Sequence, residues 1–400
     1  MPYLRMGIGA YMGKGSGLGA LNPLIWTKVN SGVTIGTEAT LSPLSAAWSI
    51  QGLVKEDLGG GVYKHTVDTT NTLHRTYRVP TNAFSTNMPA AFTVYAKKDT
   101  DSQCNRIRIN NTGSQISLNL DTGLADRAVE IESSTVTNLG SGWWKLDVKA
   151  LQGAMGGSAW ILNVYDPTNT LLTWDATGVD ARILLKDVTY SQKSIATWAD
   201  PRNPSIYWEQ ATVAAQPHLW EDSRGPCIFF KGAHYMTANG LASLFQGDDK
   251  PISFAVAADN VLAGALGTVV ISLARTTVGD FHVLRWPNAT TNALLPGRRD
   301  SDLVIVNLPV IAMPHEPQGA AIDVYDGTNR YLLACDRAEV MSAITSGATV
   351  FNTFSIGALI GGTVTNHWLG RVREIAATPG IWSQSQRAHA HNYLTSRYGY

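Results

Sequence analysis

Two adjacent tryptophans are the residues in this sequence whose type and spacing best suit ligand binding. Trp143 and Trp144 open a stretch that alternates apolar and polar residues. Neighbouring side chains of a strand point to opposite faces, so one of the two indoles must lie outside the core. The flat face of an indole attracts the C–H groups of a sugar ring. Trp143 and Trp144 are therefore candidate glycan-binding residues, unless another subunit covers the outer one.

Paired acids are a second pattern with chemical meaning. Glu130 and Glu132 are two residues apart, which places both carboxylates on one face if the stretch is a strand. Glycosidases use two carboxylates that flank one glycosidic bond. A solvated strand face explains the pair more simply, and the sequence has no Gly-x-Ser-x-Gly nucleophile motif. We predict that the chain is not an enzyme.

Metal ligands are the third pattern. The turns around Asp248 and Asp326 carry hard oxygen donors of the kind that calcium prefers. His389 and His391 are two apart in a stretch expected to be helical, where they point in different directions and do not chelate one ion. We predict no metal site and no cofactor, because plain turns explain both acidic segments. The sequence leaves calcium at these two turns open.

Cysteine count and charge exclude further classes. Cys104, Cys227 and Cys335 are few and far apart, so we expect buried thiols, although the sequence leaves a Cys227–Cys335 pair open. Lys+Arg and Asp+Glu both number 31, and proteins that bind nucleic acid usually carry a basic excess. No apolar run is long enough to span a membrane, and the first residues lack the apolar core of a secretory signal. We expect no nucleic-acid partner and no membrane insertion.

Residues 23–200 are expected to form the all-β domain that positions the tryptophans. Short stretches alternate with period two, and clusters of Gly, Asn and Asp separate them. In chain order they include a segment at Trp26, Phe92-Thr-Val-Tyr-Ala-Lys, Gly142-Trp143-Trp144-Lys-Leu and Ala181-Arg-Ile-Leu-Leu-Lys. This order resembles the carbohydrate-binding-module-like jelly rolls of phage tail and fibre proteins. The resemblance implies an antiparallel β-sandwich.

Residues 206–400 are expected to form a second β-sandwich. Prolines at 201 and 204 stiffen residues 200–204, which we interpret as the exit from the first domain. Ser383 and Gln386 form a capping-box pattern, which predicts a helix from about 384 to about 396. The strands at Phe354-Ser-Ile-Gly-Ala and Trp368-Leu-Gly-Arg-Val-Arg-Glu-Ile-Ala precede this helix. This ending resembles concanavalin A-like (laminin-G-like) lectin domains of bacteriophage particle proteins.

Charged side chains in the last predicted strand are expected to remain near water. They are Arg371, Arg373 and Glu374, and they alternate with the apolar residues Val372 and Ile375 only if the strand bends.

Residues 1–22 form a glycine-rich arm with few large side chains. We predict that it lies on a surface, either that of the chain's own domains or, preferably, that of neighbouring subunits to which it anchors the chain. Residues 1–20 are expected to contain no core position. The anchoring residues expected are Met6, Tyr11, Met12 and Leu18.

Together, these patterns predict tandem antiparallel β-sandwiches with a short C-terminal helix. The resemblances imply a structural protein of the bacteriophage virion, assembled in the host cytoplasm, that decorates the capsid or belongs to a tail fibre. Its expected partners are other virion proteins, further copies of itself in a homo-oligomer such as a trimer, and host-surface glycans. The alternative is a secreted bacterial carbohydrate-binding protein.

Overall fold

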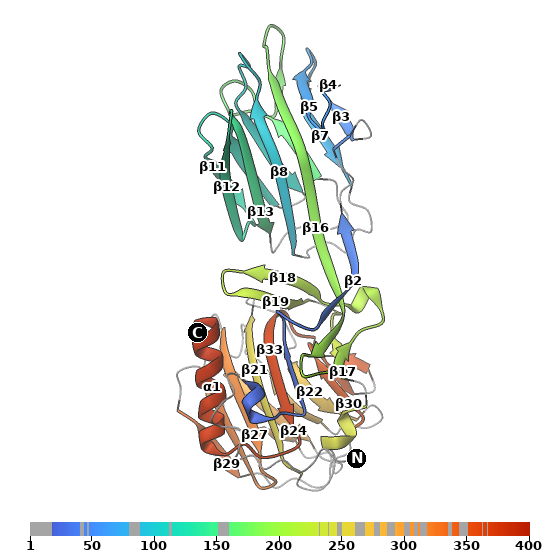
Figure 1. Ribbon diagram of the computed structural model, residues 1–400, viewed down its shortest axis with the longest axis vertical. Coiled ribbons are helices and arrows are strands. Elements are labelled where there is room, and N and C mark those ends of the chain that lie inside the picture. The colour runs from blue at the N-terminus through green and yellow to red at the C-terminus, as the bar shows by residue number, and fades with distance from the viewer. Residues whose placement is uncertain are drawn as a thin grey trace. The chain divides into compact units, whose positions relative to one another are not determined.

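The chain consists of two compact units, each an antiparallel β-sandwich (Figure 1). Unit 1 comprises Met1–Gly36 and Ser194–Tyr400, and unit 2 comprises Thr37–Lys193. The predicted all-β fold class with one short C-terminal helix is confirmed. No helix among the described residues is long and apolar enough to cross a membrane. The computed structural model describes residues 18–40, 44–45, 48–79, 89–111, 114–150, 160–231, 233–238, 240–245, 250–260, 269–275, 281–285, 293–299, 305–307, 311–312, 318–334, 338–343, 351–361, 363–365 and 367–400.

Unit 2 is built from two facing sheets, which we name after their central strands. The β8 sheet has the strand order β4 (Leu53–Asp57), β5 (Tyr63–Val67), β16 (Arg182–Asp200), β8 (Ala90–Lys98), β13 (Trp143–Ala150) and β12 (Ser133–Gly140). The β9 sheet has the order β3 (Ser49–Gln51), β7 (Arg75–Arg78), β14 (Trp160–Val164), β9 (Arg106–Asn111), β10 (Ser114–Asn119) and β11 (Ala125–Val129). A separate pair joins β6 (Asn71–Leu73) and β15 (Thr173–Asp175).

Period-two alternation explains how these strands fill one core. In β8, Phe92, Val94 and Ala96 are buried, whereas Thr93 and Tyr95 between them are only half-buried. The buried set packs against its counterparts from β9, β10 and β14 in a single apolar cluster. Each strand of the β8 sheet therefore gives one face to the core and leaves its other face outside.

Unit 1 is also a two-sheet sandwich. In the β21 sheet, β33 (Gly370–Thr378) pairs along one edge with β21 (Ile252–Asn260) and along the other with β1 (Ile25–Lys28) and β19 (Gly225–Phe230). The sheet continues from β21 through β27 (Gln318–Tyr325) and β28 (Asn329–Ala334) to β29 (Val340–Ala343), while β18 (His218–Asp222) pairs with β19.

The second sheet of unit 1, the β22 sheet, is formed by shorter strands. β22 (Val269–Ala274) pairs with β23 (Phe281–Arg285) and β30 (Thr353–Ile356), and β23 continues to β24 (Ala293–Arg299). Its remaining strands are β17 (Asn203–Glu209), β20 (Met236–Thr237), β25 (Ile305–Asn307) and β26 (Ile311–Ala312). Three further strands are β2 (Val33–Thr40), β31 (Leu359–Gly361) and β32 (Thr363–Thr365), and the short 3-10 turns are η2 (Leu18–Leu21), η3 (Val213–Ala215) and η4 (Ala242–Phe245).

Small side chains let the helix α1 (Gln384–Tyr398) pack on the outer face of the β21 sheet (Figure 1). In β21, Phe254 and Val256 face the sandwich core, whereas Ala255 and Ala257 face the cluster that contains α1. The predicted capping box is confirmed, since Gln386 N–H donates to the Ser383 hydroxyl and Gln386 Oε1 accepts from Ser383 N–H. The helix ends two residues beyond the prediction, where Gly399 adopts a left-handed conformation with φ 66°.

The division of the chain differs from the predicted one. Residues 23–36, Trp26 among them, belong to unit 1, because β1 pairs with β33 near the other end of the sequence. Residues 200–204 are not an exit from a domain, since residue 200 ends β16, residues 203–204 begin β17, and the two strands pair as a hairpin within unit 1. The buried Asp200 holds this turn by accepting hydrogen bonds from Arg202 and from the Trp26 backbone N–H.

Candidate functional site

Strand β13 places the two candidate tryptophans on opposite sides of the β8 sheet, as predicted. Trp144 packs against the core of unit 2, and its Nε1 donates to the Leu120 carbonyl over 2.8 Å. A Cβ at Gly123, where φ is 73°, would lie 2.3 Å from the Trp144 ring, so only glycine permits this contact. Trp143 lies on the outer face, where it is half-buried. Of the two candidates, Trp143 is the one positioned to meet a ligand.

A cluster of aromatic rings and lysines surrounds Trp143 on this outer face. Lys186 of β16 places its Nζ 4.7 Å from the centre of the Trp143 ring and 5.8 Å from the centre of the Tyr95 ring. Lys145 lies 6.0 Å from the same Tyr95 ring. Strand register produces this arrangement, because Tyr95 of β8 is the direct neighbour of Lys145 on one side and Lys186 on the other. We call these four residues the tryptophan–lysine cluster.

Hydrogen-bonding groups extend the cluster along the sheet. The Thr93 hydroxyl donates to Asp147 Oδ1 over 2.6 Å, and Lys145 Nζ lies 2.7 Å from Asp147 Oδ2. The hydrogen bond to Asp147 raises the pKa of Lys145, so this ammonium is charged at neutral pH. A flat apolar ring beside ammonium, hydroxyl and carboxylate groups offers both kinds of contact that a sugar makes, stacking and hydrogen bonding.

Sequence reasoning found Trp143 but missed Tyr95 and Lys186. Tyr95 lies in a strand that was predicted, and its outward orientation follows from the same alternation that buries Val94. Lys186 could not be found in this way, because its proximity to Trp143 depends on which strands are neighbours and in what register.

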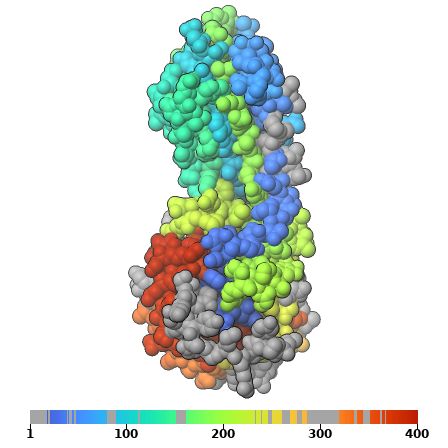
Figure 2. Space-filling view, in the orientation of Figure 1, coloured from blue at the N-terminus to red at the C-terminus, as the bar shows by residue number. Residues whose placement is uncertain are grey.

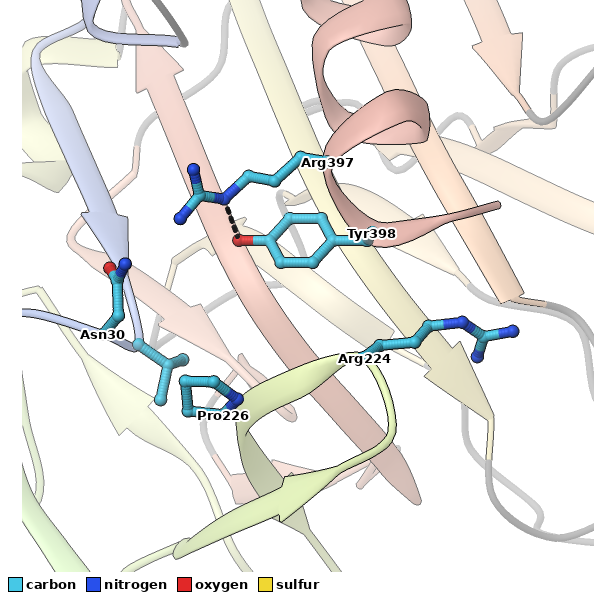
Figure 3. A pocket seen from close by; sticks show the side chains of 6 residues that line it. Asn30, Arg224, Pro226, Arg397 and Tyr398 are labelled. Atoms are coloured by element: carbon cyan, nitrogen blue, oxygen red, sulfur yellow. Dashed lines mark hydrogen bonds between the residues drawn. The ribbon is translucent and has the colours of Figure 1, made fainter.

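Unit 1 contains a pocket of about 270 Å³ beside the end of α1 (Figure 3). Arg397 and Tyr398 approach it from α1, Asn30 from the segment after β1, Arg224 from the turn between β18 and β19, and Pro226 from β19 itself. Arg397 Nε donates to the Tyr398 hydroxyl over 3.2 Å, and the Arg224 side chain extends away from Arg397. The two guanidinium groups therefore do not converge on one point of the pocket.

Buried charges lie beside this pocket. Glu374 is fully buried and accepts hydrogen bonds from Trp26 Nε1 over 2.7 Å and from the Tyr398 hydroxyl over 2.8 Å. Burial raises the pKa of Glu374, and these donors oppose that rise. Arg373 is equally buried and contacts Asp222 and Asp259 at 2.6 and 2.7 Å. The prediction that Arg373 and Glu374 remain near water is therefore wrong, because strands on both edges of β33 and α1 on its outer face enclose them.

The candidate acids and metal ligands are not brought together. Glu130 and Glu132 lie between β11 and β12, and Glu130 has a φ of 52°, so the prediction that they share a strand face is wrong. Asp326 accepts hydrogen bonds from the backbone N–H groups of Thr328 and Asn329 and so caps its own turn. Within the described part of the chain, no three His, Cys, Asp or Glu side chains could hold a metal ion together. Asp248 lies outside the described residues.

The arm and the cysteines are described in part. Leu18 is fully buried in η2 and belongs to the cluster around Ala390 and Leu394 of α1, so the prediction that the arm holds no core position is wrong at this residue. The predicted anchoring residues Met6, Tyr11 and Met12 lie outside the described residues, as does Cys335. Cys104 and Cys227 are buried free thiols, and burial raises the pKa of Cys104 to about 12.

Comparison with known proteins gives similarity in structure alone. No protein-family model and no curated protein matches this chain. Similar solved structures include the CBM40 domain of the Ruminococcus gnavus IT-sialidase bound to alpha2,3 sialyllactose, at 13% identity and a TM-score of 0.31, covering 38% of this chain and 85% of that one. Domains LG4-5 of the mouse laminin alpha1 chain are similar at 10% identity and a TM-score of 0.30, covering 80% of this chain and 89% of that one. Likeness at this level carries no argument about what this chain binds.

Proposed function

We propose that this chain binds glycans on the outer face of the β8 sheet of unit 2. The observation that carries the proposal is the pair of half-buried rings, Trp143 and Tyr95, that share one lysine on the outer face of the β8 sheet. The Lys186 ammonium and the Thr93–Asp147 pair supply the polar contacts that orient a sugar, and Trp143 supplies the stacking surface. The proposed role is binding rather than catalysis.

A glycan array probed with the full chain tests this proposal. We expect Trp143→Ala to weaken binding to the best glycan by about tenfold or more, since buried aromatic anchors contribute most of the energy of such contacts. Unfolding midpoints should stay close to the wild-type value, because Trp143 lies outside the core.

Tyr77→Ala is the matched control. Tyr77 is a half-buried ring on the other sheet of unit 2, with the Arg75 guanidinium 5.1 Å from its centre. Its removal should leave glycan binding unchanged. A chain that binds no glycan on the array, or that loses binding equally through Tyr77→Ala, would contradict the proposed site.

We also propose that the protein is a structural component of a bacteriophage particle. It would be assembled in the host cytoplasm and lie on the surface of the particle, where it can contact host-surface glycans. Support comes from the low share of charged residues, 16%, and a net charge of zero, which suit dense packing beside other copies and other virion proteins. Gold labelling of purified particles tests this part separately from the glycan array. Absence of the protein from particles, combined with glycan binding, would favour a secreted bacterial carbohydrate-binding protein.

A further inference from the structure

Sandwich edges expose unpaired backbone groups, and among the described strands three of the four edges of the β8 and β9 sheets carry features that discourage pairing. β3 has only three residues. β4 carries the consecutive charges Lys55, Glu56 and Asp57. β11 has an irregular register with β10, and its Arg127 has a φ of 54°. Short length, charge and backbone irregularity are the usual means by which proteins prevent edge-to-edge association.

The fourth edge, β12, has none of these features along most of its length. Its eight residues, Ser-Ser-Thr-Val-Thr-Asn-Leu-Gly, include no charged residue and no proline. All of them except Val136 are exposed, and the residues around β12 are uncovered on the side seen in Figure 2. Its register with β13 is regular from Ser133 to Asn138 and shifts only between Asn138 and Gly140. Within the described residues, β13 is the one strand that pairs with β12.

We propose that β12 pairs antiparallel with β12 of a second copy of this chain, across a twofold axis. Self-pairing places hydroxyl, amide and aliphatic side chains opposite one another, so no like charges meet. The central residues Thr135, Val136 and Thr137 are β-branched and therefore well suited to cross-strand packing. A net charge of zero also removes long-range repulsion between copies.

A twofold axis follows from the chemistry of this contact. Each copy offers the same strand edge, and a self-complementary contact closes after two subunits. Such an axis stands perpendicular to the sheet, so the β8 sheet continues from one copy into the next with both outer faces on the same side. The contact forms between β12 strands whether or not glycans bind to the tryptophan–lysine cluster.

Sedimentation equilibrium of the full-length chain tests the proposal. The wild-type chain should be dimeric, and Thr135→Lys with Thr137→Lys should weaken the dimer by about tenfold or more, because like charges then face each other across the axis. The control is Val54→Lys with Leu58→Lys, which adds the same charge at and just beyond β4, where both residues are exposed. The control should leave the dimer intact, and circular dichroism should show all variants folded.

Charge reversal distinguishes this pairing from other contacts. Thr135→Glu with Thr137→Glu should also dissociate the dimer, and mixing the Glu and Lys variants should restore it as a heterodimer. Restoration is expected only if β12 lies opposite β12. The proposal would be overturned if the wild-type chain were a monomer at every soluble concentration or a trimer. It would also be overturned if the Lys variant remained dimeric, if the control variant dissociated, or if the mixture of Glu and Lys variants stayed monomeric.

Discussion

Units 1 and 2 have the same sandwich architecture but differ in how deeply they bury their ion pairs. Unit 1 encloses Arg330, Asp323, Arg373 and Glu374, none of which is accessible to solvent. In unit 2 the ion pairs Lys98–Asp121 and Lys145–Asp147 lie in the outer parts of the sandwich, with side chains 29–44% exposed, and even the more buried Arg106 pairs with an Asp126 side chain that is 34% exposed. The core of unit 2 is correspondingly a single apolar cluster.

This difference affects what each unit can do. A buried ion pair adds little net stability, but the loss of one partner leaves an uncompensated charge and is costly. The buried charged side chains of unit 1 therefore stabilise the contacts between its strands and do not face a ligand. The lysines of unit 2 remain at the surface, where they can contact a ligand. We infer that the binding role belongs to unit 2 and that unit 1 is more sensitive to substitution.

Separating the units should produce the largest effect. We expect residues 37–193 alone to unfold in one cooperative transition, because both sheets and the apolar core of unit 2 lie within that range. Residues 194–400 alone should not fold cooperatively, because they lack β1 and the buried Leu18, Ile25 and Trp26. Thermal unfolding followed by circular dichroism measures both outcomes.

A chain that joins residues 1–36 directly to residues 194–400 is the control for this experiment. It restores β1 to unit 1 without unit 2 and should recover a sharp transition. A sharp transition from residues 194–400 alone would show that β1 is dispensable.

Breaking one buried ion pair should have the next largest effect. Burial alone would raise the pKa of Asp323, but Arg330 and His282 lower it to about 2, and Arg330 Nε donates to Asp323 Oδ1 over 2.6 Å. Asp323→Asn leaves the buried Arg330 without its counter-charge and should cost about 3–5 kcal/mol of unfolding free energy. Lys98→Met in unit 2 removes an exposed pair and should cost less than about 1 kcal/mol.

Urea unfolding monitored by hydrogen exchange of peptides from each unit measures these two costs separately. Equal costs for Asp323→Asn and Lys98→Met would contradict the contrast between the units.

Lowering the pH should destabilise unit 2 through His65, but by less than the loss of the Asp323–Arg330 pair destabilises unit 1. Burial, together with the nearby Lys55, lowers the pKa of His65 to about 4. In the unfolded chain the histidine pKa is about 6.5, so between pH 4 and pH 6.5 the unfolded chain binds more protons than the folded chain. The contribution of His65 to the free energy of unfolding is therefore fully present above pH 6.5 and is lost as the pH falls toward 4. The loss from His65 should be on the order of 3 kcal/mol. In His65→Leu, the free energy of unfolding of unit 2 should depend less on pH across this window, and an unchanged slope would exclude His65 as the cause.

Local signals in the sequence were sufficient to predict most elements. Alternation identified the strands around Phe92 and Trp144, and the Ser383–Gln386 capping box identified α1. Both patterns depend on residues close together in the chain. Trp143 could be singled out for the same reason, since its orientation follows from that of its neighbour.

Contacts between distant residues could not be predicted in this way. The proline-rich turn at residues 200–204 resembles a linker in sequence, and only its pairing with flanking strands shows that it is a hairpin. Arg373 and Glu374 appear solvated in sequence because their partners, Asp222 and Trp26, lie far along the chain. The position of Lys186 beside Trp143 likewise depends on strand order and register.

The pairing of β1 with β33 also has a consequence for synthesis. Trp26 donates to Glu374 across 348 positions of sequence. At a translation rate of about 5–20 residues per second, the ribosome needs on the order of 20–70 s to pass from one residue to the other. Unit 2 is complete in the nascent chain well before then. The first residues of unit 1 to be made therefore wait, with their apolar side chains unpaired, until almost all of the described sequence has been translated.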